Sequence, residues 1–206
     1  MTDHINEKYR VLCNNTSDIN EHLPTLFKYA SECESVFETG VRGCVSSWAL
    51  TKGLLENGKD KKSLFMNDIY ECDIRDLLLA TKNLPIQMDY KWINNLQLEL
   101  PDKVDMTFID TWHIYGQLKR ELKKFSILTN KYIIMHDTTV DEIYGESIRC
   151  GWNAQKQSIE SGFPIEEITC GLQKAIDEFL ETNKDWKLDI RYTNNNGLTI
   201  LKRVTL

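Results

Sequence analysis

The stretch that decides the fold is VDMTFIDTWHIYGQLKRELKKFSILTNKYIIMHD, from Val104 to Asp137. An apolar run over 104–110 is followed by residues 113–129, in which apolar side chains recur at helical spacing, and then by a second apolar run over 131–136. The runs have the length of strands, and the periodic part has the length of a helix. This order predicts two parallel strands joined by a crossover helix.

The same alternation of strand and helix patterns extends back to residue 18. Strands are predicted over 35–39, 63–69 and 86–93, and helices over 18–33 (with Ser17 or Asp18 as N-cap), 45–55 and 71–84. An alternation of this kind indicates a mostly parallel sheet with helices on both faces. We therefore expect an α/β fold.

The C-terminal part follows another pattern. Residues 138–165 are polar and aperiodic, apart from one short amphipathic piece near 145–160, and 166–183 form the last predicted helix. Two alternating runs, 186–193 and 198–204, flank Asn194-Asn195-Asn196-Gly197. An Asn-Gly turn between such runs is a strong hairpin signal. We therefore expect the sheet to end in an antiparallel hairpin.

The composition limits the class of protein. In a chain of 206 residues, 25 Lys and Arg against 31 Asp and Glu leave a net charge of -6, which argues against a nucleic-acid partner. No apolar run approaches the about 20 residues of a membrane span. The first residues, MTDHINEKYR, lack the apolar core of a signal peptide. We therefore expect a cytoplasmic protein whose six cysteines are reduced thiols.

Unusual residues gather where the predicted strands end, and ligands bind outside the carboxyl ends of open parallel sheets. The first strand runs into Glu38-Thr39-Gly40-Val41-Arg42-Gly43, whose glycines allow a tight turn and a close approach to a ligand. Asp68 ends the second strand, where an acid often holds a ribose. Asn94-Asn95 follow the third strand and suit an adenine edge. Ordinary polar turns would look the same at each of these places.

An acid and a histidine end each of the next two strands. Asp110 and His113 follow the fourth strand, and His136 and Asp137 end the fifth. Two interpretations stay open from the residues alone. The two aspartates could share a divalent cation such as Mg²⁺, for which carboxylate oxygens are suitable ligands. Alternatively, one histidine could act as a general base, because its ordinary pKa is about 6.5.

Taken together, these residues resemble a known family. Residues 36–43 are similar to the first motif of class I S-adenosylmethionine-dependent methyltransferases, and Asp68 matches their ribose-binding acid. Residues 105–113, followed by Tyr115, resemble the motif D-x-x-F-I-D-x-x-H-x-Y of sugar and small-molecule O-methyltransferases. Residues 132–139 resemble the run that follows in that branch. The resemblance covers about residues 17–204.

The resemblance implies a Rossmann-like sheet of seven strands in a single domain over 1–206, with 1–34 as a lead-in and helix and 138–165 as an acceptor lid. It also implies S-adenosylmethionine as the cofactor. The residues that it implies for the cofactor site are Glu38, Gly40, Arg42, Gly43 and Ser46 after the first strand, Asp68 and Ile69 after the second, Asn94 and Asn95 after the third, Asp110 after the fourth, and His22 near the N-terminus.

The implied reaction is transfer of a methyl group to a hydroxyl of a sugar or glycan, for example a deoxysugar such as rhamnose. His113 is the expected base, followed by His136, with Asp110 and Asp137 as the other catalytic residues. The two aspartates match metal ligands of some relatives. Thr138 stands where a third ligand is common, so a Mg²⁺ ion on Asp110 and Asp137 stays an open alternative.

Other assignments also stay open. The acceptor could be a non-sugar small molecule, or the chain could be a Rossmann-like nucleotide-binding domain without methyl transfer. Since 206 residues leave no room for a separate acceptor domain, acceptor specificity is expected from the lid, the N-terminal helix or a second subunit of a homo-oligomer. Stand-alone relatives occur beside glycosyltransferases and in large viruses, which for a viral protein would mean the host cytoplasm.

Overall fold

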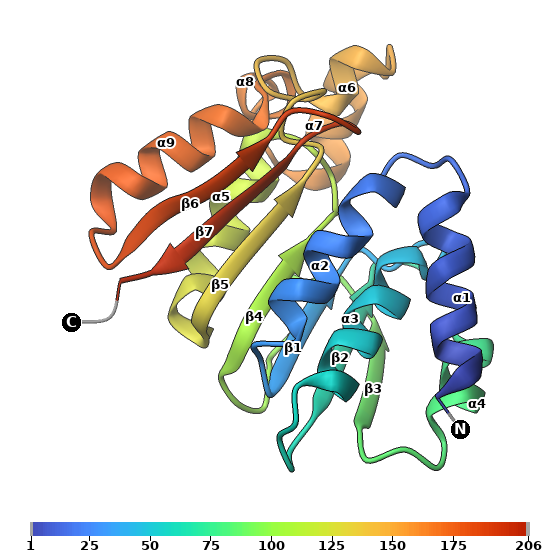
Figure 1. The fold of residues 1–206 in the computed structure, drawn as a ribbon. Helices are drawn as coiled ribbons and strands as arrows, with labels where there is room; N and C mark the ends of the chain where they lie inside the picture. The colour runs from blue at the N-terminus through green and yellow to red at the C-terminus, as the bar shows by residue number, and fades with distance from the viewer. Residues whose placement is uncertain (1, 205–206) are drawn as a thin grey trace.

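The fold is a mixed sheet with helices packed on both faces (Figure 1). The computed structural model describes residues 2–204, and within this range the sheet has seven strands in the order β3-β2-β1-β4-β5-β7-β6. β1 to β5 pair in parallel, and β7 lies antiparallel between β5 and β6, so the predicted α/β fold and closing hairpin are confirmed. The strands are β1 (Ser35–Thr39), β2 (Ser63–Asp68), β3 (Gln87–Trp92), β4 (Val104–Ile109), β5 (Thr129–His136), β6 (Trp186–Tyr192) and β7 (Leu198–Arg203).

The long helices divide between the two faces of the sheet, and the short ones lie above its upper end (Figure 1). One face carries α1 (Asp3–Asn14), α2 (Leu23–Ala30) and α3 (Val45–Glu56), with α4 (Arg75–Thr81) beside α1, and the other face carries α5 (Tyr115–Phe125) and α9 (Leu172–Thr182). The upper end carries α6 (Glu146–Arg149), α7 (Ala154–Ser161) and α8 (Ile165–Thr169). Among residues 2–204, no helix is both long and apolar enough to cross a membrane.

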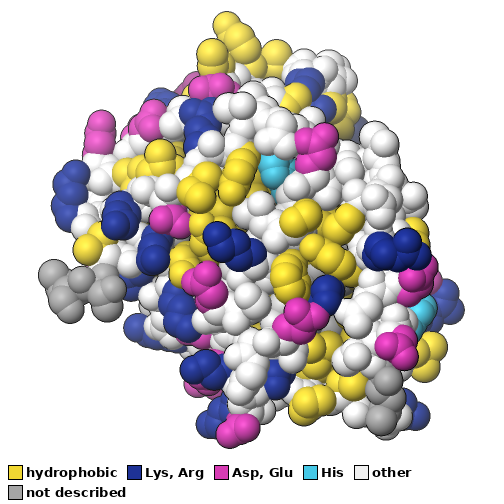
Figure 2. All heavy atoms as spheres, in the orientation of Figure 1, with side chains coloured by type: hydrophobic (Ala, Val, Ile, Leu, Met, Phe, Trp, Pro, Cys, Tyr) yellow, Lys and Arg dark blue, Asp and Glu magenta, His cyan; other side chains and the backbone are white. Residues whose placement is uncertain are grey.

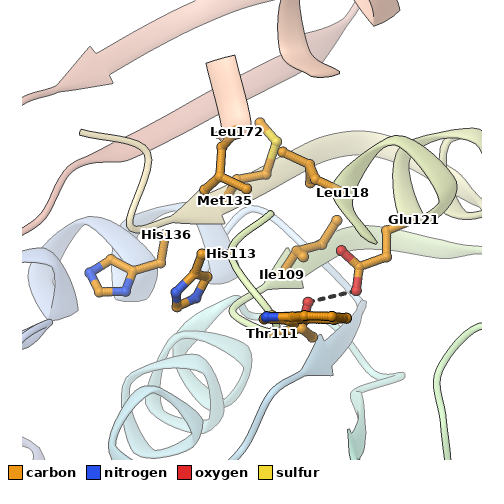
Figure 3. Close-up of a pocket in the computed structure, with 9 residues that line it drawn as sticks. Ile109, Thr111, His113, Leu118, Glu121, Met135, His136 and Leu172 are labelled. Carbon is orange, nitrogen blue, oxygen red and sulfur yellow. Dashed lines mark hydrogen bonds between the residues drawn. The ribbon is translucent and has the colours of Figure 1, made fainter. Parts of the chain in front are cut away.

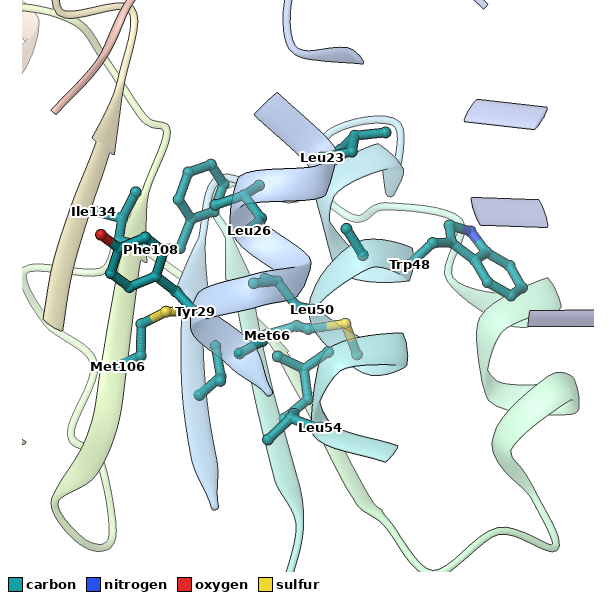
Figure 4. Packing of buried hydrophobic residues seen from close by; sticks show 14 of the residues in the cluster. Leu23, Leu26, Tyr29, Trp48, Leu50, Leu54, Met66, Met106, Phe108 and Ile134 are labelled. Atoms are coloured by element: carbon teal, nitrogen blue, oxygen red, sulfur yellow. The ribbon is translucent and has the colours of Figure 1, made fainter. Parts of the chain in front are cut away.

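The main hydrophobic core lies between α2, α3 and the sheet (Figure 4). Gly53 lets the two helices approach closely, because a Cβ there would lie 2.5 Å from the carbonyl oxygen of Phe27. Burying one large apolar side chain is worth about 1.5–3 kcal/mol, so this layer anchors the strands whose ends form the site. Fully buried members from the helices and strands are Leu23, Leu26, Leu50, Leu54, Met66, Met106 and Phe108.

The structure corrects three expectations about helices. α1 is a helix that the sequence patterns do not predict. The helix expected over 18–33 starts only at Leu23, after a 3-10 turn, because Pro24 lacks an N–H and fits only the first turn of a helix. The helix expected over 166–183 is split into α8 and α9, and a Cβ on Gly171 at the break would lie 2.5 Å from a backbone carbonyl oxygen.

The hairpin turn holds the residues that follow β5. Asn195 and Asn196 adopt left-handed backbone angles, with φ 44° and 68°. The carbonyl of Asn196 accepts the backbone N–H groups of Thr139 and Val140 at 2.9 and 3.0 Å. Because the turn is tied to this segment, the closing hairpin helps to position the end of β5.

Candidate active site

The carboxyl ends of β1 and β4 meet where the strand order changes direction. α3 follows β1 on one face of the sheet and α5 follows β4 on the other, the arrangement in which ligands bind between the two strand ends. Gly40 has φ +94°, and a Cβ on it would lie 1.7 Å from the carbonyl oxygen of Asp110. Only glycine fits, so the tight turn expected at Gly40 is present and brings the two strand ends together.

Asp68 holds the loop that follows Gly40. Its Oδ2 accepts the backbone N–H groups of Val41 and Arg42, both at 2.9 Å. Arg42 and Cys44 adopt left-handed backbone angles, with φ 41° and 58°. The expectation that Gly43 is needed for the turn is wrong, because its φ is not positive and a Cβ on it would have its nearest contact at 3.9 Å. Non-glycine residues in this strained conformation often mark ligand-binding loops.

Glu38 and Ser46 lie beneath this loop. The Glu38 carboxylate is fully buried and accepts hydrogen bonds from the hydroxyls of Ser46 and Ser47 at 2.5 and 2.6 Å. Burial raises the pKa of Glu38 to about 7, although the two hydroxyls lower it in part. The cofactor contacts expected of Glu38 and Ser46 remain predictions. Both residues join the end of β1 to the first turn of α3 and support the loop from below.

Two exposed isoleucines lie on the β2 and β3 side of the loop. Ile69 follows Asp68 directly and is 59% exposed. The carbonyl of Asp68 accepts the N–H of Ile93 at 2.8 Å, which places Ile93 on the same side. The sequence patterns do not single out Ile93. Together, the isoleucines offer an apolar surface next to the carboxylate, as a nucleoside requires.

Two residues expected at the cofactor are turned into the interior. Asn95 is buried, and its side chain donates to Thr39 Oγ1 at 2.9 Å and accepts from Gln117 at 3.0 Å. His22 is also buried, and its Nε2 donates to the carbonyls of Asn194 and Asn195 at 3.0 and 3.1 Å. Their polar atoms bond to protein groups, and the expected cofactor contacts of Asn95 and His22 remain predictions.

Asn94 stays partly exposed at the end of β3. Its side-chain oxygen accepts the backbone N–H of Leu96 at 2.9 Å, so it also organises the local turn. The assignment of Asn94 to the cofactor remains a prediction.

An acid–histidine cluster lies on the β4 and β5 side of Gly40. His113 Nε2 lies 3.1 Å from Asp110 Oδ1, and His113 Nδ1 lies 3.1 Å from Asp137 Oδ2. Two further carboxylates approach Nδ1, from Asp141 at 3.4 Å and from Glu146 at 3.7 Å. The expected convergence of Asp110, His113 and Asp137 at one edge of the sheet is confirmed, and the structure adds Asp141 and Glu146 to it.

The carboxylates keep His113 in its charged form. Burial alone would lower the pKa of His113, but the neighbouring Asp110, Asp141 and Asp137 outweigh burial and raise it well above its ordinary value. Burial would likewise raise the pKa of Asp110, but His113 and His136 hold it below its ordinary value. A charged imidazole cannot accept a proton, so the protein without a bound cation does not favour the predicted role of His113 as base at neutral pH.

His136 contacts Asp110 on the buried side of the cluster and is 2% exposed. Its Nδ1 lies 3.4 Å from Asp110 Oδ1, and its Nε2 lies 3.3 Å from the carbonyl oxygen of Asn195. Burial would lower the pKa of His136, but Asp110 and Asp137 raise it. Figure 3 shows His136 beside His113. Both ring nitrogens of His136 face protein groups, and its role as the second candidate base remains a prediction.

Asp110, His113 and Asp137 fit a divalent cation. Each offers one ligand atom, and these atoms lie within 4.8 Å of one another. Asp137 Oδ1 and His113 Nδ1 are buried and have no hydrogen-bond partner of acceptable geometry within residues 2–204. Burial raises the pKa of Asp137, which indicates that its carboxylate lacks sufficient counter-charge. Two carboxylates and one imidazole suit Mg²⁺ or Mn²⁺.

The segment 138–165, here called the lid, is anchored on this cluster. Arg149 donates two hydrogen bonds to the buried carboxylate of Asp141 at 2.7 and 2.8 Å. Phe163 stacks on Trp112, with ring centroids 6.0 Å apart. Sequence patterns do not single out Asp141 or Arg149, because a polar residue in an aperiodic segment resembles any loop residue. The spacing of four residues between Asp137 and Asp141 is the only sequence signal for that pair.

Large apolar side chains are exposed on the lid. Figure 2 shows apolar side chains at the top of the molecule, over the loops and short helices. The exposed apolar residues of the lid include Ile143, Tyr144, Ile148, Trp152 and Ile159. Among them, Tyr144 and Trp152 carry aromatic rings, which can pack on a sugar or on another flat acceptor.

Comparisons with known proteins identify the fold. No protein-family model matches the chain, and no curated protein sequence matches it. The O-methyltransferase TomG from Streptomyces achromogenes, solved with S-adenosylmethionine, is 12% identical with a TM-score of 0.56, over 98% of this chain and 90% of that one. An O-methyltransferase from Bacillus cereus, solved with S-adenosylhomocysteine, is 11% identical with a TM-score of 0.54, over 97% and 90%.

The acceptor atom differs among the similar structures. The N-methyltransferase NodS from Bradyrhizobium japonicum WM9, solved with S-adenosylhomocysteine, is 12% identical with a TM-score of 0.54, over 98% of this chain and 99% of that one. At identities this low, the likeness establishes the fold alone. The chain has the Rossmann-like fold seen in S-adenosylmethionine-dependent methyltransferases.

Proposed function

We propose that this chain is an S-adenosylmethionine-dependent O-methyltransferase that methylates a hydroxyl group of a sugar or glycan. The observation that carries the proposal is the contact between Gly40 and Asp110, which sets the loop held by Asp68 directly beside the acid–histidine cluster. A cofactor over the ends of β1 and β2 would present its reactive group to the ends of β4 and β5. The names of the similar O-methyltransferase structures favour the same activity.

The ribose of the cofactor is assigned to Asp68. A carboxylate has about four acceptor positions, and the N–H groups of Val41, Arg42 and Tyr70 occupy three of them. The remaining position, on Oδ1, can accept a ribose hydroxyl. The exposed Ile69 is assigned to the adenine face, as its 59% exposure allows.

The methionine end of the cofactor is assigned to Gly40 and Arg42. The Arg42 guanidinium contacts Asp18 at 2.5 Å, but its side chain is 77% exposed. An exposed ion pair of this kind is worth about 0–1 kcal/mol, so Arg42 can turn from Asp18 to the cofactor carboxylate at little cost. Glu38 and Ser46 support this loop from beneath.

The cofactor supplies an electrophilic methyl group on a sulfonium. The residues of the cluster must place the acceptor hydroxyl in line with that methyl group and take its proton, because the pKa of an alcohol lies far above neutral. His113 already holds a proton when the carboxylates around it carry no other counter-charge. In that state Asp137, whose pKa burial raises, is the better proton acceptor.

A divalent cation would be held by Asp110, His113 and Asp137. It would supply Lewis acidity, which lowers the pKa of a bound hydroxyl. Buried Asp137 Oδ1, which has no hydrogen-bond partner in the described part of the chain, supports this assignment. The predicted base His113 and the predicted metal ligands therefore occupy one site.

The acceptor is assigned to the space beneath the lid. Exposed Tyr144 and Trp152 can stack on the flat face of a sugar ring, which supports a sugar or glycan. A non-sugar small molecule is the second candidate, favoured by the similar structure of TomG, which is named for tomaymycin synthesis. We place the reaction in the cytoplasm, where the six cysteines would stay reduced.

A methyl-transfer screen tests the proposal. Tritium-labelled S-adenosylmethionine is incubated with the protein and with deoxysugars, short oligosaccharides and catechols, and products are located by mass spectrometry and NMR. Calorimetric titration with S-adenosylhomocysteine and with NAD is run in parallel. We expect S-adenosylhomocysteine to bind. Heat with NAD alone would overturn the cofactor assignment, and labelled catechol without labelled sugar would overturn the acceptor.

A matched pair of variants locates the cofactor. Asp68→Asn should weaken S-adenosylhomocysteine binding by about tenfold, the loss expected for one strong hydrogen bond. Asp73→Asn is the control, because Asp73 is an exposed acid that pairs with Arg75 and bonds to no residue of the loop after Gly40 among the described contacts. Equal affinities of the two variants would remove Asp68 from the cofactor site.

A further inference from the structure

A polar cluster is buried beneath the strand ends, between α5 and β1. Its central group is the carboxyl of Glu121, which is 1% exposed and has no ion-pair partner within residues 2–204. Burying a carboxyl group without a cation is unfavourable unless hydrogen bonds compensate for the lost water. Burial raises the pKa of Glu121, as expected for such a place. Glu121 has no part in the proposed cofactor, acceptor or cation sites.

One oxygen of Glu121 connects three segments of the chain. Glu121 Oε1 accepts hydrogen bonds from Thr111 Oγ1 at 2.6 Å, from Asn95 Nδ2 at 2.5 Å and from Gln117 Nε2 at 2.8 Å. Figure 3 shows the bond between Thr111 and Glu121. Asn95 Nδ2 also donates to Thr39 Oγ1 at 2.9 Å. Glu121 is therefore joined to the loop after β4, the loop after β3 and the end of β1.

The residues joined by Glu121 adjoin both halves of the proposed site. Thr111 follows Asp110 and lies two residues before His113. Thr39 precedes Gly40, and its hydroxyl donates to Asn67 Oδ1 at 3.0 Å, at the end of β2. A shift of Thr111 would move the acid–histidine cluster relative to the loop that Asp68 holds. Displacements near 1 Å in such a geometry can reduce a rate by about 100-fold.

We propose that Glu121 is a positioning residue, which holds the loop carrying Asp110 and His113 against the end of β1 through Thr111 and Asn95. Its effect on methyl transfer rests on the proposed function, whereas its effect on the position of the loop does not. Glu121 is assigned no contact with cofactor or acceptor. The neighbouring Trp112 reports the position of the loop, because its indole N–H donates to Ser147 Oγ at 3.2 Å.

A second threonine, Thr107, serves as the control that separates an effect on the position of the loop from an effect on general stability. Thr107 lies on β4, the strand that leads into the loop of Thr111, and it is fully buried. It shares a hydrogen bond of 2.6 Å with Thr129, at the other end of β5 from His136. Thr111→Val and Thr107→Val make the same chemical change, and each removes one hydrogen bond between side chains. Only Thr111→Val breaks the link to Glu121. Glu121→Gln keeps an oxygen that can accept the three bonds, whereas Glu121→Ala removes all of them.

The experiment uses the full chain and four variants: Thr111→Val, Thr107→Val, Glu121→Ala and Glu121→Gln. Nitrogen-15 NMR gives the indole N–H shift of Trp112, assigned with Trp112→Phe, and urea unfolding gives the stability of each variant. We expect Thr111→Val and Glu121→Ala to move the Trp112 signal and to reduce methyl transfer by about 10- to 100-fold. Thr107→Val should leave the signal in place, and Glu121→Gln should restore it.

The outcomes decide the proposal even when one variant is unstable. If Glu121→Ala does not fold, Thr111→Val against Thr107→Val gives the answer. A Trp112 signal that moves equally in both threonine variants, or in neither, overturns the positioning role. A Glu121→Gln protein that behaves like Thr111→Val also overturns it. If the parent protein neither binds S-adenosylhomocysteine nor transfers methyl groups, the proposed function fails, and the Trp112 signal still decides the role of Glu121.

Discussion

Replacing Gly40 by alanine tests whether the contact between β1 and β4 creates the site. A Cβ on Gly40 would lie 1.7 Å from the carbonyl oxygen of Asp110 and 2.5 Å from its carbonyl carbon. Ordinary van der Waals contact begins near 3.4 Å. The two strand ends would therefore have to separate by roughly 1.5 Å. The φ of +94° adds a second penalty, because residues with a side chain rarely adopt it.

We expect Gly40→Ala to lose about 3 kcal/mol of stability, from about 1–3 kcal/mol of overpacking and about 1–2 kcal/mol of backbone strain. A domain typically has about 5–15 kcal/mol, so the variant should remain folded at 25 °C. Its site should nevertheless be altered, because the loop held by Asp68 and the cluster at Asp110 move apart. Affinity for S-adenosylhomocysteine should fall by at least about tenfold, in keeping with such a displacement.

Gly58→Ala is the matched control. Gly58 also has a positive φ, +68°, but a Cβ there meets no described atom within 4 Å. It shares the backbone strain of Gly40→Ala without the collision. Urea unfolding gives the difference in free energy between the two variants, and calorimetry gives the affinity for S-adenosylhomocysteine. Equal stabilities, together with unchanged affinity in Gly40→Ala, would refute the reasoning.

Three further predictions follow from the site. Burial raises the folded-state pKa of Glu38 to about 7 from 4.5, so the folded protein binds more protons than the unfolded chain between these pH values. The stability should therefore fall as the pH rises from 4.5 to about 7. In Glu38→Gln, urea unfolding at pH 5 and pH 8 should no longer show this fall. Arg149→Met should lower the free energy of unfolding by about 2 kcal/mol at pH 7, because Asp141 loses the partner that holds its pKa down. This loss of stability should shrink as the pH falls toward 4 and Asp141 takes up a proton. An equal loss in urea unfolding at both pH values would contradict this. Excess chelator should abolish methyl transfer, and added Mg²⁺ should restore it. Added Mg²⁺ should not give activity to Asp137→Asn. Full activity in chelator would exclude a cation.

Much of the fold follows from local sequence patterns. Apolar runs of strand length alternate with helical periods from residue 18 to residue 136, and the Asn-Gly turn marks the hairpin. These signals depend on near neighbours in the chain, so they can be recognised without knowing how the chain packs. The helix boundaries are less predictable. α1 is polar overall and buries only Ile5, and the break at Gly171 depends on backbone atoms that are about 30 residues away in sequence.

The sequence by itself also determined which side chains lie at one edge of the sheet, because parallel strands place their carboxyl ends together. These side chains are Asp68, Asp110, His113 and Asp137. The tertiary structure decided which side chains are free to act. It buried His22, Asn95 and His136 against protein groups, and it brought Asp141 and Arg149 to the cluster. It also placed Glu121 beneath the strand ends. Hydrogen-bond partners and burial depend on distances between segments remote in sequence, and no spacing of residues along the chain encodes those distances.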